Sequence, residues 1–144
     1  MLVKKIKFGS KDYYDLLEFR YINLRKPLNL NWSSDDLKNE NEQIHFALKK
    51  KKIIIGSCIL KQLGKKEGCI RQMAISTEFQ NNGYGKKLLR YAENYAFKQN
   101  IIKINIKARM SAVGFYLKEG YKKEGKIFID VTVKSVKMIK FLDK

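Results

Sequence analysis

Two glycines and two lysines stand together near the middle of the chain, in a pattern that suits the binding of an anion. Gly83 and Gly85 follow Gln80 by three and five residues, and Lys86 and Lys87 come directly after them. A helix that begins here leaves its first N–H groups without partners, and its dipole adds about half a positive charge. Glycines let a phosphate approach the backbone closely. The segment therefore predicts a backbone site for a phosphate or diphosphate.

The spacing of these residues excludes two common nucleotide-binding loops. A Walker A loop needs a serine or threonine after its glycine-lysine pair, whereas Gly85-Lys86 is followed by another lysine. A Rossmann fingerprint needs a third glycine three residues after the second, where Leu88 stands. From these residues alone, an ordinary glycine-containing loop without a ligand remains the alternative.

A predicted strand and a predicted amphipathic helix flank this segment and must position it. Three β-rich runs at residues 44–48, 53–60 and 69–75 are separated by short turns, which predicts an antiparallel meander that ends before the glycines. A helix follows at once, because six residues recur at helical spacing on one face: Tyr84, Leu88, Leu89, Ala92, Tyr95 and Ala96.

The ends of the chain predict further strands and helices. Residues 2–8 predict a strand, and Ser10 can cap a helix over residues 11–25 that ends before Pro27. We expect four residues on the buried stripe of that helix: Tyr14, Leu17, Tyr21 and Leu24. A short second helix, capped within residues 33–36, should follow.

After the central helix, residues 101–107 alternate Ile102, Ile104 and Ile106 with polar residues, which predicts a strand with one buried face. A short helix at residues 111–119 should end at Gly120. Two runs at residues 127–133 and 136–142 predict a hairpin. Together these elements predict an α+β fold in a single domain over residues 1–144, with a strand–helix–strand crossover in its middle.

Composition excludes several classes of protein. The 144 residues lack both an apolar run of the roughly 18 residues that a membrane span needs and the apolar core of a secretory signal. We therefore expect a cytoplasmic protein without a membrane partner. Two cysteines are too few for a disulfide scaffold, and the single histidine, His45, excludes a multi-histidine metal site. No metal is expected.

The net charge of +17 is concentrated in residues 49–144 and attracts anionic partners. One alternative is a basic module that binds nucleic acid, and another is a set of solvated lysines without a specific partner. Lysine far outnumbers arginine, although phosphate and base recognition usually recruit arginine, and no known nucleic-acid-binding motif is present. Nucleic acid is therefore the less favoured partner.

Two segments resemble the GNAT superfamily of N-acetyltransferases. Gln-x-x-Gly-x-Gly at residues 80–85, after a strand reading Arg-Gln-Met-Ala-Ile at 71–75, resembles its acetyl-CoA-binding motif. Ala112, Phe115, Tyr116, Gly120 and Tyr121 resemble its second signature, at the expected separation. The resemblance implies a central, mostly antiparallel sheet with one parallel, splayed strand pair and helices on both faces.

The resemblance also implies acetyl-CoA as co-substrate and assigns its site. The pantetheine arm would pair with the backbone of Met73, Ala74 and Ile75, between splayed strands at residues 68–75 and 101–107. The pyrophosphate would lie on the loop and helix start. The cofactor-binding residues implied there and on the second signature are Gln80, Asn81, Asn82, Gly83, Tyr84, Gly85, Lys86, Ser111 and Phe115.

By the same resemblance, the reaction is direct acetyl transfer to a primary amine in a ternary complex. Tyr116 would be the catalytic acid that donates a proton to the departing thiolate. The alternative is a core tyrosine without a catalytic role. The general base stays unassigned among Glu78, Asp130 and His45, and a chain of water molecules or an amine that enters in its neutral form would need none of them. A non-catalytic fold that only binds acetyl-CoA is a further alternative.

The acceptor is expected to be a small-molecule amine, because a positive surface disfavours polyamines and basic peptides. Two departures from similar proteins bear on it: Arg109 replaces a common asparagine, and Ser135 replaces a histidine of the last hairpin. The resemblance also implies a possible homodimer.

Overall fold

The computed structural model describes residues 2–32 and 37–143, and they form a seven-stranded sheet with the order β1-β2-β3-β4-β5-β7-β6. The strands are β1 (Leu2–Ile6), β2 (Ile44–Lys50), β3 (Ile53–Gln62), β4 (Glu67–Ile75), β5 (Lys103–Arg109), β6 (Lys122–Asp130) and β7 (Val133–Phe141). The predicted meander is confirmed, because β2, β3 and β4 pair antiparallel in sequence order. The predicted last hairpin is confirmed as β6 and β7, and it begins five residues earlier than expected, at Lys122.

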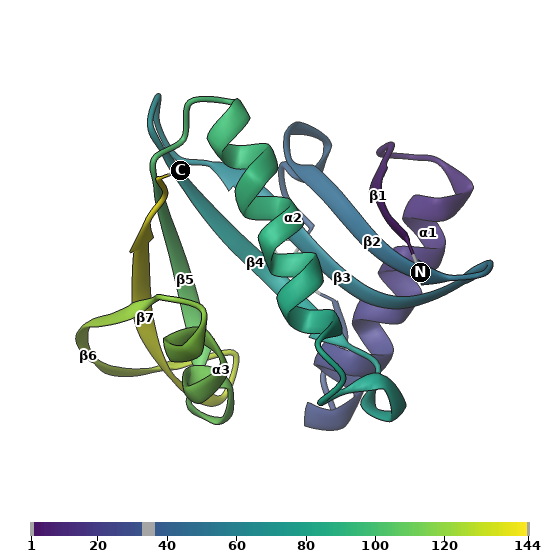
Figure 1. Cartoon of the computed structure of the whole chain (residues 1–144). Coiled ribbons are helices and arrows are strands. Elements are labelled where there is room, and N and C mark those ends of the chain that lie inside the picture. Colours follow the sequence, from purple (N-terminus) through teal and green to yellow (C-terminus); the bar gives the residue numbers. More distant parts are fainter. Residues whose placement is uncertain (1, 33–36, 144) are drawn as a thin grey trace.

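Helices lie on both faces of this sheet, as expected (Figure 1). They are α1 (Lys11–Arg20), α2 (Tyr84–Lys98) and α3 (Val113–Lys118). α2 crosses in front of the sheet in Figure 1, whereas α1 lies behind it. None of the helices in the described residues combines the length and apolar composition needed to cross a membrane.

Short helical turns complete the described chain. A π-helical turn (Tyr21–Arg25) and a 3-10 turn (Lys26–Leu28) prolong α1, and further 3-10 turns occupy Glu40–Glu42, Thr77–Phe79 and Met110–Ala112. The second helix that we expected to be capped within residues 33–36 depends on residues outside those described.

The parallel pair β4–β5 is short, and its two strands then separate. Only Glu67, Gly68 and Cys69 are in register with β5, opposite Lys103, Ile104 and Asn105. Beyond this point β4 continues to Ile75 and β5 to Arg109 without pairing to each other. Figure 1 shows the two strands diverging below α2. The sheet therefore has an internal opening between two strands that run in the same direction.

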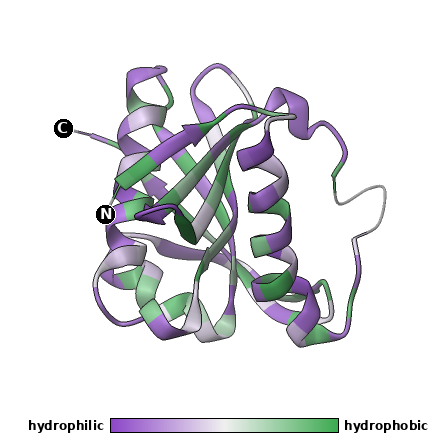
Figure 2. Cartoon of the chain, turned by 90° about the vertical axis from the view of Figure 1, so that its right-hand side faces the viewer, coloured by the Kyte–Doolittle hydropathy of each residue, from purple (hydrophilic) through white to green (hydrophobic). Residues whose placement is uncertain are grey.

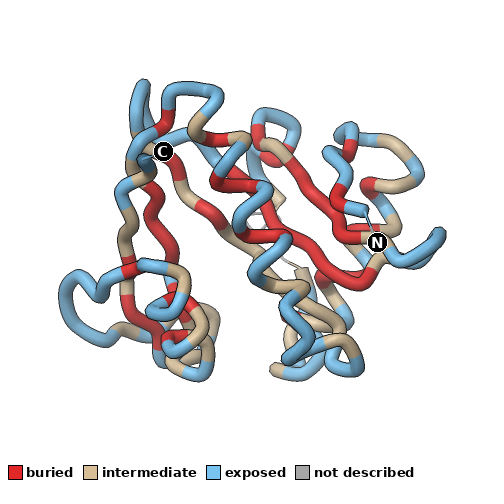
Figure 3. Tube along the Cα trace, in the orientation of Figure 1, coloured by how far each residue is buried: buried red, intermediate tan, exposed pale blue. Residues whose placement is uncertain are grey.

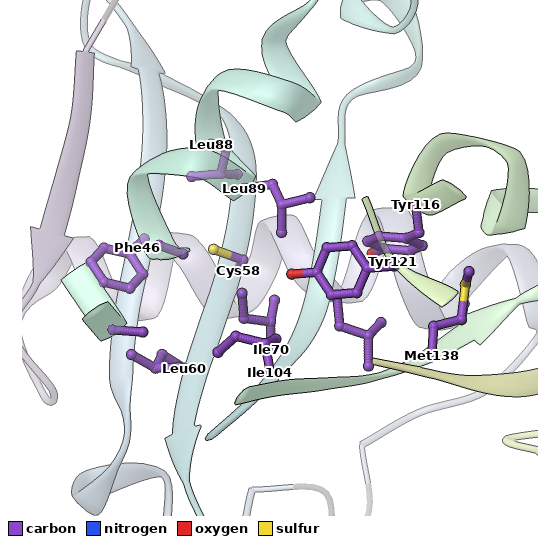
Figure 4. Close-up of a cluster of buried hydrophobic side chains, with 14 of the residues drawn as sticks. Phe46, Cys58, Leu60, Ile70, Leu88, Leu89, Ile104, Tyr116, Tyr121 and Met138 are labelled. Atoms are coloured by element: carbon purple, nitrogen blue, oxygen red, sulfur yellow. The ribbon is translucent and has the colours of Figure 1, made fainter. Parts of the chain in front are cut away.

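The larger core fills the α2 side of the sheet. Figure 3 shows buried residues running along the central strands and the inner face of α2, and Figure 2 shows hydrophobic and hydrophilic residues interspersed along both strands and helices. Leu88, Leu89, Ala92 and Ala96 of α2 are buried there as predicted, while Tyr84 and Tyr95 pack at the margin. Figure 4 shows this cluster extending from Phe46 to the rings of Tyr116 and Tyr121, which meet edge to face, and to Met138.

The predicted stripe of the first helix is confirmed only in part: Leu24 is buried and Leu17 packs beside the smaller core cluster, but Tyr14 and Tyr21 are not buried. The helix buries Tyr13, Leu16, Phe19 and Arg20, whereas Tyr14 is 61% exposed. The reason is an ion pair: Arg20 is fully buried because Nη1 and Nη2 donate to the two Glu40 carboxylate oxygens at 2.8 and 2.6 Å. A buried charge is stable only when it is paired, and here the partner lies 20 residues away.

The strand predicted at residues 101–107 also needs a correction. Ile104 and Ile106 are buried as expected, but Ile102 is 42% exposed because β5 begins only at Lys103. Ile101, in the turn after α2, is buried instead. The predicted helix at residues 111–119 is a 3-10 turn followed by α3, and Gly120 ends it with a φ of 94°.

Candidate functional site

A cleft of about 1520 Å³ opens where β4 and β5 separate. Its walls come from β4, β5, the start of α2, α3 with the 3-10 turn before it, and the π-helical turn after α1. Eight basic residues line the cleft against two acidic ones, Glu119 and Asp130. The basic residues are Arg25, Lys61, Arg71, Lys86, Lys107, Arg109, Lys118 and Lys137. The cleft is therefore long enough for an extended ligand and carries a positive field.

A β-bulge interrupts β4 beside this cleft. Ser57 pairs with Ala74 and Ile59 with Arg71, so β4 holds one extra residue, and Gln72 adopts a left-handed φ of 54°. The Ser57 hydroxyl donates to the Gln72 carbonyl at 2.9 Å, which holds the bulge in place. A bulge leaves backbone groups outside the ladder, and bulges are frequent next to active sites. The backbone around residue 73 is thereby available to a ligand in the cleft.

The first turn of α2 forms the other end of the cleft. Gly83 has a φ of 79° at the N-cap and provides no side-chain hydrogen bond, so no cap occupies the first N–H groups of α2. A Cβ on Gly85 would lie 3.3 Å from the Phe115 ring, so glycine at this position leaves the space between the start of α2 and that ring unfilled. Lys86 adds a full charge at the same turn. These features fit a diphosphate, which needs several N–H donors and a close approach.

The structure brings most of the predicted site residues to this one cleft. Eleven of them line it: Met73, Ala74, Ile75, Gln80, Asn81, Gly83, Gly85, Lys86, Ser111, Phe115 and Tyr116. Asn82 and Tyr84 do not; the Asn82 amide donates to the Gln80 carbonyl at 3.1 Å, and the Tyr84 ring packs beside Phe79. The Gln80 amide donates to the Ile75 carbonyl at 2.9 Å and so joins the loop to the end of β4.

Tyr116 lies between the core and the cleft. It is 5% exposed, packs edge-on against Phe115 and Tyr121, and lines the cleft. Burial raises its pKa above the usual range, so the phenol is neutral at physiological pH. Among the described residues no protein group forms a hydrogen bond with its hydroxyl. A neutral, unengaged hydroxyl can donate a hydrogen bond to a ligand.

The three candidates for a general base lie in different places. Asp130 lines the cleft, whereas His45 and Glu78 do not. His45 is buried; its Nε2 lies 2.8 Å from the Glu40 carbonyl oxygen, and burial lowers its pKa. Of the three, Asp130 alone has access to a molecule in the cleft.

Sequence reasoning missed the polar network that supports the α1 side of the cleft. Burial raises the pKa of Glu40, but the hydrogen bonds and charge of Arg20 outweigh it and hold that pKa below the usual range. Arg71 Nη1 donates to Gln43 at 2.9 Å and lies 3.4 Å from Glu40. Because Arg71 also lines the cleft, this network fixes one of its cationic walls.

Two buried acceptors lie where the strands part. Gln72 Oε1 and Asn105 Oδ1 have no donor among the described residues, and both residues line the cleft. Asn105 belongs to the last pair of the β4–β5 register, and its amide donates to Glu67 at 2.7 Å. No sequence pattern indicates these acceptors, since they depend on where the two strands separate.

Comparison with known protein families and solved structures shows which family has this fold and this cleft. The sequence profile of the Acetyltransferase (GNAT) family matches residues 10–121. The chain therefore belongs to the GNAT acetyltransferase family, and the expected family and α+β fold are confirmed. A search of curated proteins by sequence finds no significant match.

Solved structures with low sequence identity share this fold. A protein from Lactobacillus plantarum described as an N-acetyltransferase superimposes with a TM-score of 0.85 at 18% identity, covering 99% of both chains. A GNAT-family acetyltransferase from Staphylococcus aureus gives 0.78 at 20% identity, covering 99% of this chain and 100% of its own. An aminoglycoside 6'-N-acetyltransferase solved with coenzyme A gives 0.79 at 17% identity, covering 98% of this chain and 97% of its own.

Proposed function

We propose that this protein transfers an acetyl group from acetyl-CoA to a primary amine, directly and within a ternary complex. The observation that carries the proposal is the opening between β4 and β5, which leads from unpaired strand edges to the uncapped start of α2. An extended thioester ligand with a diphosphate matches both ends of that path. Family membership and the coenzyme A complex of the aminoglycoside acetyltransferase support the same ligand.

In this proposal the backbone performs most of the binding. The first N–H groups of α2 hold the diphosphate, with Gly83 and Gly85 giving access and Lys86 adding charge. The edge of β4 around residues 73–75 pairs with the pantetheine arm. An N–H group at the bulge polarises the thioester oxygen as the tetrahedral intermediate develops.

Tyr116 acts on the leaving group. Burial keeps its phenol neutral, and its unengaged hydroxyl donates a hydrogen bond to the departing sulfur. The raised pKa makes full proton transfer less favourable, so we assign Tyr116 the role of hydrogen-bond donor that stabilises the thiolate. Asp130 is the candidate that accepts the proton from the amine, since it lines the cleft.

Calorimetric titration tests this proposal. Acetyl-CoA should bind saturably and keep its affinity at higher salt, whereas a random oligonucleotide should bind only weakly and with steep salt dependence. Release of the coenzyme A thiol on addition of amines then separates an enzyme from a protein that only binds acetyl-CoA. Tight oligonucleotide binding without acetyl-CoA binding would contradict the proposal and favour a nucleic-acid-binding module.

A further inference from the structure

The α1 side of the cleft carries arginines that the diphosphate site does not explain. Residues alternate between the two faces of a strand, and Ala108 and Ile70 belong to the core on the α2 side. Their neighbours Arg109 and Arg71 therefore project to the opposite face. Arg109 reaches the π-helical turn after α1, where Nη2 donates to the Leu24 carbonyl at 3.2 Å. The α2 terminus and its lysine lie on the other side of the sheet.

Arg109 differs from Arg71, which lies 3.4 Å from the Glu40 carboxylate. It is half-buried, and among the described residues it has no carboxylate within ion-pair distance and one hydrogen bond, to a carbonyl. Burial, followed by the charge of Arg25, lowers its pKa, and Asp130 only partly opposes this. A guanidinium has five N–H donors, and burying it without acceptors is costly. An anion in the cleft would relieve that cost.

Arg25 and Arg71 add charge to the same wall while engaged elsewhere. Arg25 is 4% exposed and stacks over the Trp32 ring at 4.8 Å. Arg71 is held by Gln43 and Glu40. Three guanidinium groups thus line this end of the cleft against one carboxylate, that of Asp130. A polycationic acceptor would meet repulsion here, whereas an anionic group would be attracted.

We propose that the acetyl acceptor is a small amine that carries a carboxylate, and that Arg109 binds this carboxylate through paired N–H groups. The proposal rests on the acetyl transfer proposed above and adds its substrate class. A bidentate arginine–carboxylate pair fixes orientation as well as charge, which places the amine at a set distance from the β4 bulge.

Acetyl transfer from the thioester to this amine needs no reactant beyond the two substrates. The neutral amine nitrogen attacks the thioester carbon, and the nitrogen–carbon bond forms as the carbon–sulfur bond breaks. The amine gives up one proton to a base or to water, and the coenzyme A thiolate takes one up. The carboxylate stays unchanged and serves only to position the amine.

Paired acceptors test the proposal. Amino acids with the amine at different distances from the carboxylate are each compared with their carboxamide in a thiol-release assay. We expect kcat/KM to be at least ~10-fold higher for the best acid than for its amide, as one charge-assisted hydrogen-bonded pair provides. Amidation lowers the pKa of an α-amine and makes more of it neutral, so the chemistry alone would favour the amide.

Variants assign the preference to one side chain. Arg109→Gln should bring the acid-to-amide ratio close to one and leave coenzyme A affinity unchanged. Lys98→Gln is the control for the loss of one positive charge, because Lys98 lies in the last turn of α2, outside the cleft lining. It should keep the wild-type ratio. A preference for the acid that persists in Arg109→Gln would overturn the assignment.

Binding is also measured without turnover, by titrating each acid and its amide into the protein with coenzyme A present. Tighter binding of an acid, lost at least ~10-fold in Arg109→Gln, supports the proposal even if no transfer is seen. Equal binding of acids and amides, or acetylation of amides or polyamines in preference to acids, overturns the acceptor class and leaves acetyl transfer standing. Failure of coenzyme A itself to bind would instead count against the proposed function.

Discussion

Placing a negative charge in the first turn of α2 should weaken coenzyme A binding while stabilising the fold. The variant is Gly85→Asp and its matched control is Gly85→Asn, which adds a side chain of nearly the same size. In both, the new Cβ meets the Phe115 ring at 3.3 Å, so the ring must move by a few tenths of an ångström. Any difference between the two variants therefore reports the charge.

The magnitude follows from Coulomb's law. Two unit charges about 5 Å apart interact by about 3 kcal/mol at an effective dielectric constant of about 20. Salt and solvent reduce this, so we expect coenzyme A to bind Gly85→Asp at least ~10-fold more weakly than Gly85→Asn, which is about 1.4 kcal/mol. The fold should respond in the opposite direction, because an acid near a helix N-terminus stabilises it by about 0.3–1 kcal/mol.

Calorimetry with coenzyme A and thermal unfolding of both variants provide the test. The expected result is a higher Tm but a larger Kd for Gly85→Asp than for Gly85→Asn. Loss of binding therefore cannot be attributed to unfolding. Equal affinities in the two variants would refute the reasoning, since a diphosphate held at the start of α2 must respond to a charge beside it.

Three further perturbations test the hydroxyl, the buried ion pair and the packing beneath the cleft. Tyr116→Phe should lower kcat at least ~10-fold and leave coenzyme A affinity unchanged. Tm should also stay unchanged, because no protein group among the described residues forms a hydrogen bond with the hydroxyl; an unchanged kcat would contradict the role of Tyr116. Glu40→Ala leaves Arg20 buried without a partner and should lower the free energy of unfolding by about 3–5 kcal/mol in urea titration, and a loss below 1 kcal/mol would contradict the pairing. In the wild type the folded-state pKa of Glu40 is lowered, so its contribution is present above 4.5 and is lost as the pH falls through that lower pKa; urea titrations at several pH values should show this decline. Gly56→Ala places a Cβ 2.8 Å from Ile75 Cδ1 and should cost about 1–3 kcal/mol in the same assay, and an unchanged stability would show that Ile75 moves aside freely.

Elements defined by local spacing could be predicted from the sequence. α2 begins and ends close to the expected residues, because Leu88, Leu89, Ala92 and Ala96 recur at helical spacing and face one core. Gly120 ends α3 as expected because its φ of 94° suits glycine. The meander was predictable because three β-rich runs are separated by short turns, and β2, β3 and β4 pair antiparallel in that order. In each case the information lies within about ten residues.

Features that depend on distant partners could not be predicted. Arg20 is buried only because Glu40 meets it, and no local pattern reveals that pair. The prediction that Ile102 is buried failed because β5 starts two residues later than predicted, at Lys103, where it pairs with Glu67 of β4.

The candidate site shows the same division. The glycines and Tyr116 were predictable from motifs, whereas Arg71, Gln72 and Asn105 were not singled out as cleft residues. Gln72 matters through a bulge opposite β3, and Asn105 through its place at the last β4–β5 pair. The charge that Arg109 adds to the α1 side became interpretable only once the strand alternation and the Leu24 contact were known.

The short β4–β5 register has a consequence for how the molecule holds together. Three pairs of residues are the seam between the four-stranded part of the sheet, β1 to β4, and the three-stranded part, β5 to β7. A ligand that adds backbone-like hydrogen bonds along the open edges would serve as an eighth strand and fasten the two parts. Amide hydrogens of β5 near the opening should then exchange more slowly once that strand is supplied, so that the co-substrate completes the architecture it reacts in.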